Sequence, residues 1–265
     1  MTWHDFLNAL IMGMVEGITE FLPVSSTGHL IIAGDLLDFT GPSADTFEIA
    51  VQSGAMLAAC WLYRGRFAGA CARLPAQPVS QNLLFHLLLA FLPAAGLGVA
   101  FHHEIMARLF NGHTVGWALI VGGVAMLVLE RLPRPVRAQS VEQLRWPEAV
   151  KIGCAQMLSL IPGTSRAAAT IIGGLYFGLS RQAATEFSFL LGIPTLLAAT
   201  GYQLYDRLSL FTAAEMDRLI VGTSAAFVCA LAAIRGLLRY VSRHDFTFFA
   251  WYRIVFGAVV LYYWR

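Results

Sequence analysis

Six stretches of apolar sequence are each long enough to cross a lipid bilayer, and they restrict the chain to the class of membrane proteins. A membrane-spanning helix needs about 20 mostly apolar residues. Of the 265 residues, 57% are hydrophobic and only 13% are charged, whereas soluble domains carry about 25% charged residues. We therefore predict an all-α integral membrane protein. The six stretches lie at 46–63, 82–101, 113–130, 183–202, 217–238 and 246–264.

The remaining composition excludes several classes of function. A net charge of +2 gives no basic surface for nucleic acid, so we expect no nucleic-acid partner. The four cysteines stand singly, without metal-ligand spacing, and are predicted to be small packing residues. The N-terminus lacks a basic segment and an A-x-A site, so we do not expect a cleaved signal peptide.

Two further regions, 5–38 and 147–179, are apolar but interrupted by proline, glycine and polar residues. Pro23 and Pro162–Gly163 mark the interruptions, because proline removes a backbone donor and restricts the residue before it. Irregular backbone at membrane depth is tolerated only where protein or a water-filled cavity surrounds it. We therefore predict two re-entrant hairpins, each made of two short helices that meet inside the membrane.

Arginines gather in three of the segments between the apolar stretches. Segments 64–81, 131–146 and 235–245 are rich in arginine, whereas 203–217 is mainly acidic and 102–112 is weakly charged. Basic loops stay in the cytoplasm. If both broken regions re-enter rather than span, the six stretches satisfy this pattern, and both termini lie on the outer side.

A shift of 140 positions aligns GMVEGITEFLPVSS (13–26) with GCAQMLSLIPGTSR (153–166), and the match continues without a gap to Phe47 and Phe187. Each half would hold one hairpin and three spans, and an odd number of crossings inverts the second half. Inverted-topology repeats place their functional site near the midplane, where the broken helices meet. We predict a single membrane domain, 1–265, with halves 1–130 and 147–265 joined by a basic cytoplasmic loop at 131–146. It would contain about six transmembrane helices and two hairpins touching tip to tip.

The first broken region contains EGITEFLPVSSTGHL (16–30). Glu16 and Glu20 are four residues apart and share one helix face, and an ionisable group inside a membrane is a functional candidate by default. Oxygen ligands suit Mg²⁺ or Ca²⁺, so this pair predicts a divalent-cation site; a solvated helix face is the alternative.

Ser26 and His29 also share a face, as a serine nucleophile and its histidine base would. Alternatively, Ser25 and Ser26 cap the following helix and His29 only packs. Thr27 is expected to bond to the backbone rather than to react.

The second broken region contains PGTSRAAAT (162–170). Gly163, Thr164 and Ser165 would stand at a helix N-terminus, which attracts anions. Arg166 adds a forked cation suited to phosphate oxygens, and Thr170 lies one turn further on the same face. Alternatively, Arg166 only neutralises Glu16 or Glu20. Facing each other, the two tips suit phosphoryl transfer on a lipid headgroup.

EGITEFLPVSSTGHL and PGTSRAAAT closely resemble the two signature regions of the undecaprenyl-pyrophosphate phosphatase family, also called bacitracin-resistance proteins. The resemblance extends over the chain, including FEIAVQSGAMLAA (47–59) and EFSFLLGIPTLLAA (186–199). It implies an inner-membrane hydrolase that removes the terminal phosphate of undecaprenyl pyrophosphate, so that the lipid carrier is reused in cell-wall synthesis. It also implies a divalent cation and a site open to the periplasm.

The resemblance assigns residues as well. The family's acidic motif falls on Glu16 and Glu20, its serine and histidine on Ser26 and His29, and its arginine motif on Ser165, Arg166 and Thr170. The family commonly has a serine after the arginine, where this chain has Ala167, so a hydroxyl there is not essential to this protein. The residues expected around the pyrophosphate are Ser25, Thr27, Gly163, Thr164, Ser165, Arg166 and Thr170.

These patterns lead to one mechanistic hypothesis. Arg166 holds the pyrophosphate, Glu16 and Glu20 bind the metal, and Ser26 attacks phosphorus with His29 as base; water activated by a glutamate or the metal is the alternative nucleophile. A flippase or transporter of the polyprenyl-phosphate carrier is the rival function, because transporters also use inverted repeats with broken helices. The sequence leaves open whether the protein forms a homodimer.

Overall fold

Helices make up most of the chain that the computed structural model describes, which comprises residues 2–72, 78–207 and 213–264. An isolated parallel bridge between Ala138 and Leu179 ties the linker 131–146 to the turn between α8 and α9. The α-helices are α1 (Trp3–Thr19), α2 (Ser26–Leu36), α3 (Pro42–Ala72), α4 (Pro78–Ala100), α5 (His102–Leu109), α6 (Gly112–Arg131), α7 (Trp146–Gln156), α8 (Arg166–Tyr176), α9 (Arg181–Arg207), α10 (Ala213–Val241) and α11 (Thr247–Tyr263). Two 3₁₀ helices, η1 (Val141–Gln143) and η2 (Met157–Leu160), complete the described elements.

Each of the six predicted spans lies on a helix, namely α3, α4, α6, α9, α10 or α11. Within the described residues, α4, α6, α9 and α10 are long and apolar enough to cross a membrane. Helix α11 is equally apolar but has only 17 residues, and α3 carries Glu48, Gln52 and Ser53 inside its predicted stretch. The chain is therefore a multi-pass, all-α membrane protein, and the count of six crossings stays a prediction.

The predicted loop boundaries were wrong at several places, because helices continue past the apolar sequence. Helix α3 extends to Ala72, so that 64–72 is helical, while 73–77 lies outside the described residues. Helix α5 occupies most of the predicted loop 102–112. Long arginine side chains cover apolar surface with their stems, and the Arg64 guanidinium lies 4.1 Å from the centre of the Trp61 ring. Charge therefore marks where a helix leaves the apolar layer rather than where it ends.

The two broken regions are interrupted where proline predicts. The first break, residues 20–25, separates α1 from α2, and the second break, residues 161–165, separates η2 from α8. Ser25 (φ 73°, ψ 100°) and Ser165 (φ 70°, ψ 119°) are the N-cap residues of α2 and α8. Each hydroxyl accepts a hydrogen bond from the backbone N–H three residues ahead, on Gly28 or Ala168. A positive φ is unfavourable for serine, yet both breaks adopt it.

The similarity of the two broken regions continues to the C-terminal ends of α2 and α8. The Phe39 N–H donates to Gly34 O at 2.7 Å, and the Leu179 N–H donates to Gly174 O at 2.9 Å. These pairs are 140 positions apart, as are Ser25 and Ser165. The local backbone geometry therefore recurs at the shift seen in the sequence. The inverted orientation of the halves, and their division at 130 and 147, stay predictions.

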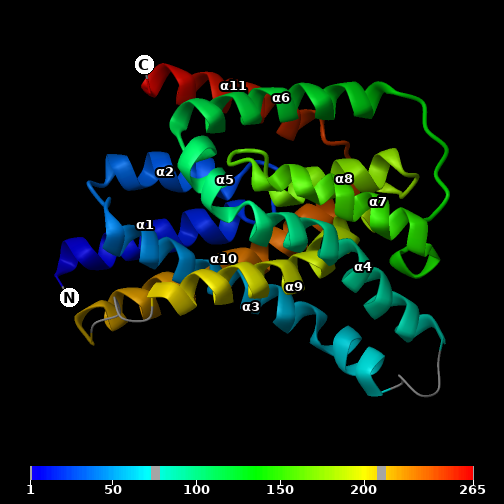
Figure 1. Cartoon of the computed structure of the whole chain (residues 1–265), viewed down its shortest axis with the longest axis horizontal. Coiled ribbons are helices and arrows are strands. Elements are labelled where there is room, and N and C mark those ends of the chain that lie inside the picture. The colour runs from blue at the N-terminus through cyan, green and yellow to red at the C-terminus, as the bar shows by residue number, and fades with distance from the viewer. Residues whose placement is uncertain (1, 73–77, 208–212, 265) are drawn as a thin grey trace.

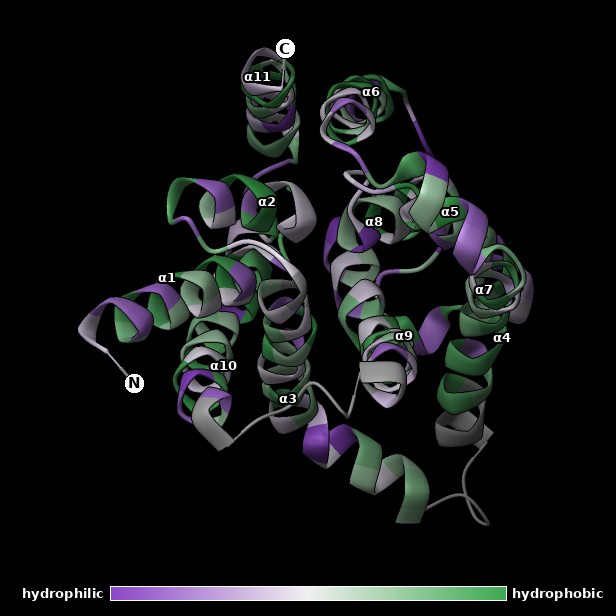
Figure 2. Ribbon diagram, turned by 60° about the vertical axis from the view of Figure 1, so that its left-hand side comes forward, coloured by the Kyte–Doolittle hydropathy of each residue, from purple (hydrophilic) through white to green (hydrophobic). Residues whose placement is uncertain are grey.

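Helix α9 runs through the middle of the molecule beside α3, while α1 packs on α10 and α4 on α7 (Figure 1). Helices α6 and α11 form a pair along the edge next to α2 and α8. In the most apolar window of α9, 61% of residues are buried, against 22–28% for α4, α6 and α10. Figure 2 shows these outer helices coloured largely as hydrophobic. Apolar side chains on them, such as Leu88, Val121 and Val228, are exposed, as on lipid-facing helices. The core around α8 and α9 includes Ile171, Leu175, Phe187, Phe189 and Leu190.

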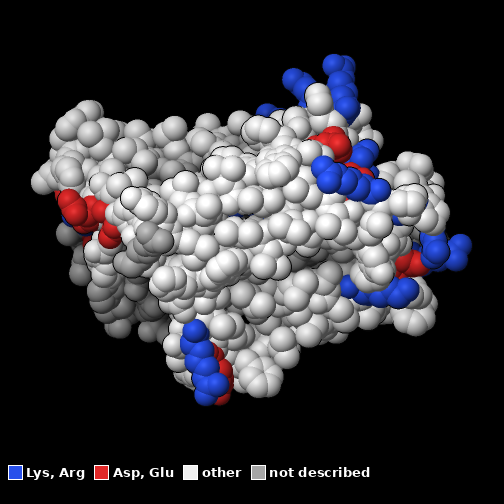
Figure 3. Space-filling view, turned by 90° about the horizontal axis from the view of Figure 1, so that it is seen from above, with Lys and Arg blue, Asp and Glu red and all other residues white. Residues whose placement is uncertain are grey.

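Charge is unevenly distributed along the molecule. Figure 1 shows both termini at one end and the linker 131–146 at the other. Arginines gather at the linker end (Figure 3), where Arg66 of α3 also pairs with Glu142. The predicted orientation assigns that end to the cytoplasm. Its exposed arginines include Arg131, Arg137, Arg145, Arg235, Arg239 and Arg243.

Candidate active site

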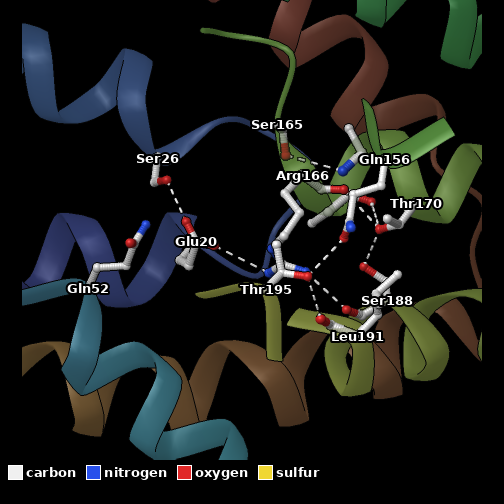
Figure 4. Close-up of polar contacts among 12 residues, drawn as sticks. Glu20, Ser26, Gln52, Gln156, Ser165, Arg166, Thr170, Ser188, Leu191 and Thr195 are labelled. Carbon is white, nitrogen blue, oxygen red and sulfur yellow. Dashed lines mark hydrogen bonds and ion pairs between the residues drawn. The ribbon is translucent and has the colours of Figure 1, made fainter. Parts of the chain in front are cut away.

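An ion pair joins the first break to the second. Arg166 Nη2 lies 3.2 Å from Glu20 Oε1, and the two side chains are only 8% and 6% exposed. The other carboxylate oxygen of Glu20 accepts the hydroxyl hydrogen of Ser26, at 2.6 Å. Figure 4 shows the three side chains approaching from the two breaks. The structure thus brings together the acid, the hydroxyl and the cation that the motifs predict, while their chemical roles stay predictions.

The local backbone explains why these side chains meet. Ser26 and Arg166 are the first residues of α2 and α8, directly after the positive-φ caps. Glu20 is the C-cap residue of α1, and its N–H donates to Glu16 O. The Phe21 ring lies beside the Arg166 guanidinium, 5.6 Å from Cζ to the ring centre, which stabilises the cation.

The Arg166 guanidinium is oriented by more than its ion pair. Its Nη1 donates to Ser188 O in α9 at 3.0 Å. Thr170 Oγ1 donates to Arg166 O at 2.8 Å and lies 2.7 Å from Ser188 Oγ, so Thr170 fixes the start of α8 against α9. Arg166 Nε is buried without a hydrogen-bond partner among the described residues. One donor of the guanidinium is therefore not used by the described part of the chain.

Glu16 is the most isolated acid of the site. Its side chain is 1% exposed, and within the described residues neither carboxylate oxygen has a hydrogen-bond partner. Its electrostatic neighbours are Glu20, Glu48 and Arg166. A buried carboxylate that lacks such partners is costly unless a proton or a cation neutralises it, so Glu16 fits the predicted role of a cation ligand.

The part of the chain that the structure describes contains no group of three or more His, Cys, Asp or Glu arranged to hold a metal ion. Mg²⁺ is commonly held by one or two carboxylates, with waters and substrate phosphates supplying the other ligands. Glu16 and Glu20 are compatible with this kind of site.

His29 is engaged elsewhere than predicted. Its Nδ1 lies 2.7 Å from Ser25 O and its Nε2 lies 2.6 Å from the Tyr252 hydroxyl. Because a carbonyl oxygen only accepts, Nδ1 carries the proton of the neutral ring and Nε2 accepts from Tyr252. The ring also stacks on Phe256, with centroids 4.1 Å apart. Both ring nitrogens of His29 are thus engaged with residues other than Ser26. The hydroxyl of Ser26 is hydrogen-bonded to Glu20, and the expected pairing of Ser26 with His29 is not formed.

The other residues predicted around a pyrophosphate occupy varied positions. Thr27 lies half-buried in the first turn of α2, and Thr164 borders a cavity of about 680 Å³ between α6 and α8. Gly163 has φ 92°, and a Cβ there would lie 2.5 Å from Val115 O. Only glycine fits this position, and its carbonyl accepts a hydrogen bond from Arg253. Gly163 thus shapes the second break rather than presenting a side chain to the site.

Sequence reasoning missed several residues that support the site. Ser188 and Thr195 lie within EFSFLLGIPTLLAA, and Thr195 Oγ1 donates to Gln156 Oε1 at 3.2 Å. Arg253 of α11 is completely buried. An arginine inside a predicted span is a functional candidate by default, so the signal for Arg253 was present in the stretch 246–264.

Residues 9–259 match the protein family described as "Bacitracin resistance protein BacA". The chain is 55% identical over 256 residues to "Undecaprenyl-diphosphatase 2" of Rhodospirillum rubrum, covering 96% of this chain and 93% of the relative. It is 54% identical over 259 residues to "Undecaprenyl-diphosphatase" of Dechloromonas aromatica, covering 98% and 94%. It is 52% identical over 261 residues to "Undecaprenyl-diphosphatase" of Methylococcus capsulatus, covering 98% and 96%.

Proposed function

The chain belongs to the bacitracin resistance protein family, and on this premise we propose that it hydrolyses undecaprenyl pyrophosphate to undecaprenyl phosphate and inorganic phosphate. The observation that carries the proposal is the contact of Glu20 with both Ser26 and Arg166. A carboxylate, a hydroxyl and a buried cation are thus in contact at the N-termini of α2 and α8. Such a group suits transfer of a phosphoryl group, where positioning and charge neutralisation dominate.

Arg166 binds the pyrophosphate in this proposal. The guanidinium is desolvated and its Nε donor is unused by the described residues, so it attracts an anion far more strongly than an exposed arginine would. Ser188 O and Glu20 fix its plane. The Phe21 ring packs beside it, so the cation is oriented before substrate arrives.

Ser26 is the proposed nucleophile and Glu20 its base. As the Ser26 oxygen bonds to the terminal phosphorus, its proton passes to Glu20, and the bridging P–O bond breaks to release undecaprenyl phosphate. Glu20 gives this proton to the departing undecaprenyl phosphate and becomes a carboxylate again. Water then attacks the phosphoserine and gives a proton to Glu20, which passes it to the Ser26 oxygen as the serine O–P bond breaks and phosphate is released. Glu20 takes the role predicted for His29, because it holds the hydroxyl hydrogen bond. His29 instead donates to Ser25 O and steadies the turn before the nucleophile.

The predicted divalent cation would be held by Glu16 and Glu20. Glu16 supports this assignment through its buried oxygens, which lack hydrogen-bond partners among the described residues. When bound, such a cation would neutralise part of the pyrophosphate charge. Through Glu20, such a cation would lie next to both Ser26 and Arg166.

The flippase alternative is less well supported. The matched relatives bear the name of a diphosphatase, and binding a lipid carrier does not require a hydroxyl held by a carboxylate. We further propose that the protein lies in a bacterial inner membrane with its site open to the periplasm, where it recycles the carrier for cell-wall synthesis and confers bacitracin resistance. Reconstitution in liposomes separates the two functions, since a phosphatase releases phosphate without moving lipid between leaflets.

Ser26→Ala tests the covalent route. We expect phosphate release from undecaprenyl pyrophosphate to fall at least about 1,000-fold, and a phosphoserine to be trapped at Ser26 in the unaltered protein by rapid acid quench and mass spectrometry. Ser242→Ala, at an exposed residue just after α10, is the matched control and keeps full activity. Retention of most turnover by Ser26→Ala would instead identify water, activated by Glu20, as the nucleophile.

A further inference from the structure

Arg253 of α11 is fully buried and bonds only to backbone carbonyls among the described contacts. Nη1 donates to Pro23 O at 3.2 Å, and Nη2 donates to Ala118 O at 3.2 Å and to Gly163 O at 3.3 Å. The first of these acceptors lies in the first break, the second in α6 and the third in the second break. One side chain therefore connects both breaks to the outer helix pair.

The acceptors in the two breaks are equivalent positions. Pro23 and Gly163 are 140 positions apart, the shift that also relates Ser26 to Arg166. Each carbonyl lies three residues before the reactive side chain of its own break. The guanidinium is therefore bonded to the same point of the backbone in both breaks.

Helices α6 and α11 resemble each other in sequence, but α6 has no arginine at the position equivalent to Arg253. GWALIVGG (116–123) resembles AWYRIVFG (250–257), and this alignment sets Leu119 against Arg253. Both residues are fully buried. Burying a cation against carbonyl dipoles is expensive compared with burying a leucine. This free-energy cost indicates that Arg253 has a role other than filling the core.

We propose that Arg253 is a positioning residue that holds the two breaks at the separation at which Glu20 and Ser26 meet Arg166. Its planar fork can bond to several carbonyls at once, which the point charge of a lysine cannot reproduce. Loss of the fork lets the breaks move independently, and a displacement of about 1 Å costs about 100-fold in rate. The effect on turnover rests on the proposed phosphatase function.

Gly122 of α6 offers a second way to disturb the same contact. A Cβ at Gly122 would lie 2.3 Å from Arg253 Nη2. Gly122→Ala therefore displaces the guanidinium while leaving its charge in the protein. Gly96→Ala in α4 is the matched control, because a Cβ there has no neighbouring atom within 4 Å.

The test compares Arg253→Lys, Gly122→Ala, their combination and Gly96→Ala in the purified full-length protein. We expect kcat for phosphate release from undecaprenyl pyrophosphate to fall about 100-fold in Arg253→Lys, with KM within about threefold of the parent. Gly122→Ala lowers kcat in the same way, and the combination is no worse than Arg253→Lys alone, because both changes act on one contact. Gly96→Ala matches the parent.

Hydrogen exchange supplies a readout that does not depend on activity. We expect faster exchange in both peptides that cover the breaks, 20–28 and 160–168, with α3 and α9 unchanged. Unchanged kcat in folded Arg253→Lys, faster exchange at one break only, or a uniform rise over the chain would each overturn the proposal. If Arg253→Lys does not fold, Gly122→Ala decides by the same criteria. If the parent protein releases no phosphate, the proposed function fails, and exchange at the two breaks alone decides the role of Arg253.

Discussion

The two breaks share a backbone but carry opposite chemistry. Ser25 and Ser165 cap their helices with nearly the same positive φ, and the residues after them, Ser26 and Arg166, meet at Glu20. Before the caps, the first break has its acid at Glu20, and the equivalent residue of the second half is Leu160, the last residue of η2. A single scaffold used twice thus supplies an acidic half and a cationic half, and neither half alone contains both the acid and the cation.

The residues one helical turn before Glu20 and Leu160 also differ in charge between the two halves. Glu16 and Gln156 occupy equivalent positions and are both buried. Gln156 Oε1 accepts a hydrogen bond from Thr195, whereas both Glu16 oxygens lack partners among the described residues. The first half is therefore suited to a cation and the second to a neutral amide.

Removing the cation of the second break is expected to have the largest effect. Arg166→Ala leaves Glu20 buried without its cationic partner, and we expect phosphate release to fall about 1,000-fold. Breaking a buried pair also lowers the free energy of unfolding by about 3–5 kcal/mol, measurable by thermal unfolding in detergent. Arg239→Ala, exposed near the end of α10, is the control. Normal turnover in Arg166→Ala would remove the cationic half from the chemistry.

Exchanging the residues at positions 16 and 156 tests their different roles. Glu16→Gln should raise the divalent-cation concentration for half-maximal phosphate release at least about tenfold, without loss of stability, because a costly buried carboxylate is removed. Gln156→Glu should lower the free energy of unfolding by about 1–3 kcal/mol, since the new carboxylate has no cation. Activity is titrated with metal buffers. A Glu16→Gln titration identical to that of the parent would rule Glu16 out as a ligand.

The smallest effects are expected at the two caps, and there the halves should behave alike. Ser25→Ala and Ser165→Ala lose the capping hydroxyl and keep the positive φ, so each should lower the free energy of unfolding by about 1 kcal/mol. Ser25→Gly and Ser165→Gly should cost only a few tenths of that, because glycine adopts this backbone freely. A glycine variant less stable than the alanine variant at either position would contradict the shared geometry.

Much of the fold was predictable because apolar length and proline position act locally. The helices of the six spans and the breaks at Pro23 and Pro162–Gly163 agree with the structure. Helix ends such as Ala72 were missed, because arginine stems let a helix continue beyond the apolar layer.

The site was predictable only in part. Glu20, Ser26 and Arg166 stand in the two motifs and lie together as expected. The hydrogen-bond partner of His29 Nε2 is Tyr252, 223 positions away. The spacing of residues along one helix cannot predict such a long-range contact. Arg253 was missed because its stretch was counted as apolar, although the charge itself marked it.

The most direct test of a single site built from two breaks is a double-mutant cycle on phosphate release from undecaprenyl pyrophosphate. The four proteins are the parent, Glu20→Gln, Arg166→Gln and the combination. If the two side chains act as a unit, each single change lowers kcat about 1,000-fold and the combination is no slower than the weaker single variant. Two independent losses that multiply in the combination, or full turnover in either single variant, would contradict the account.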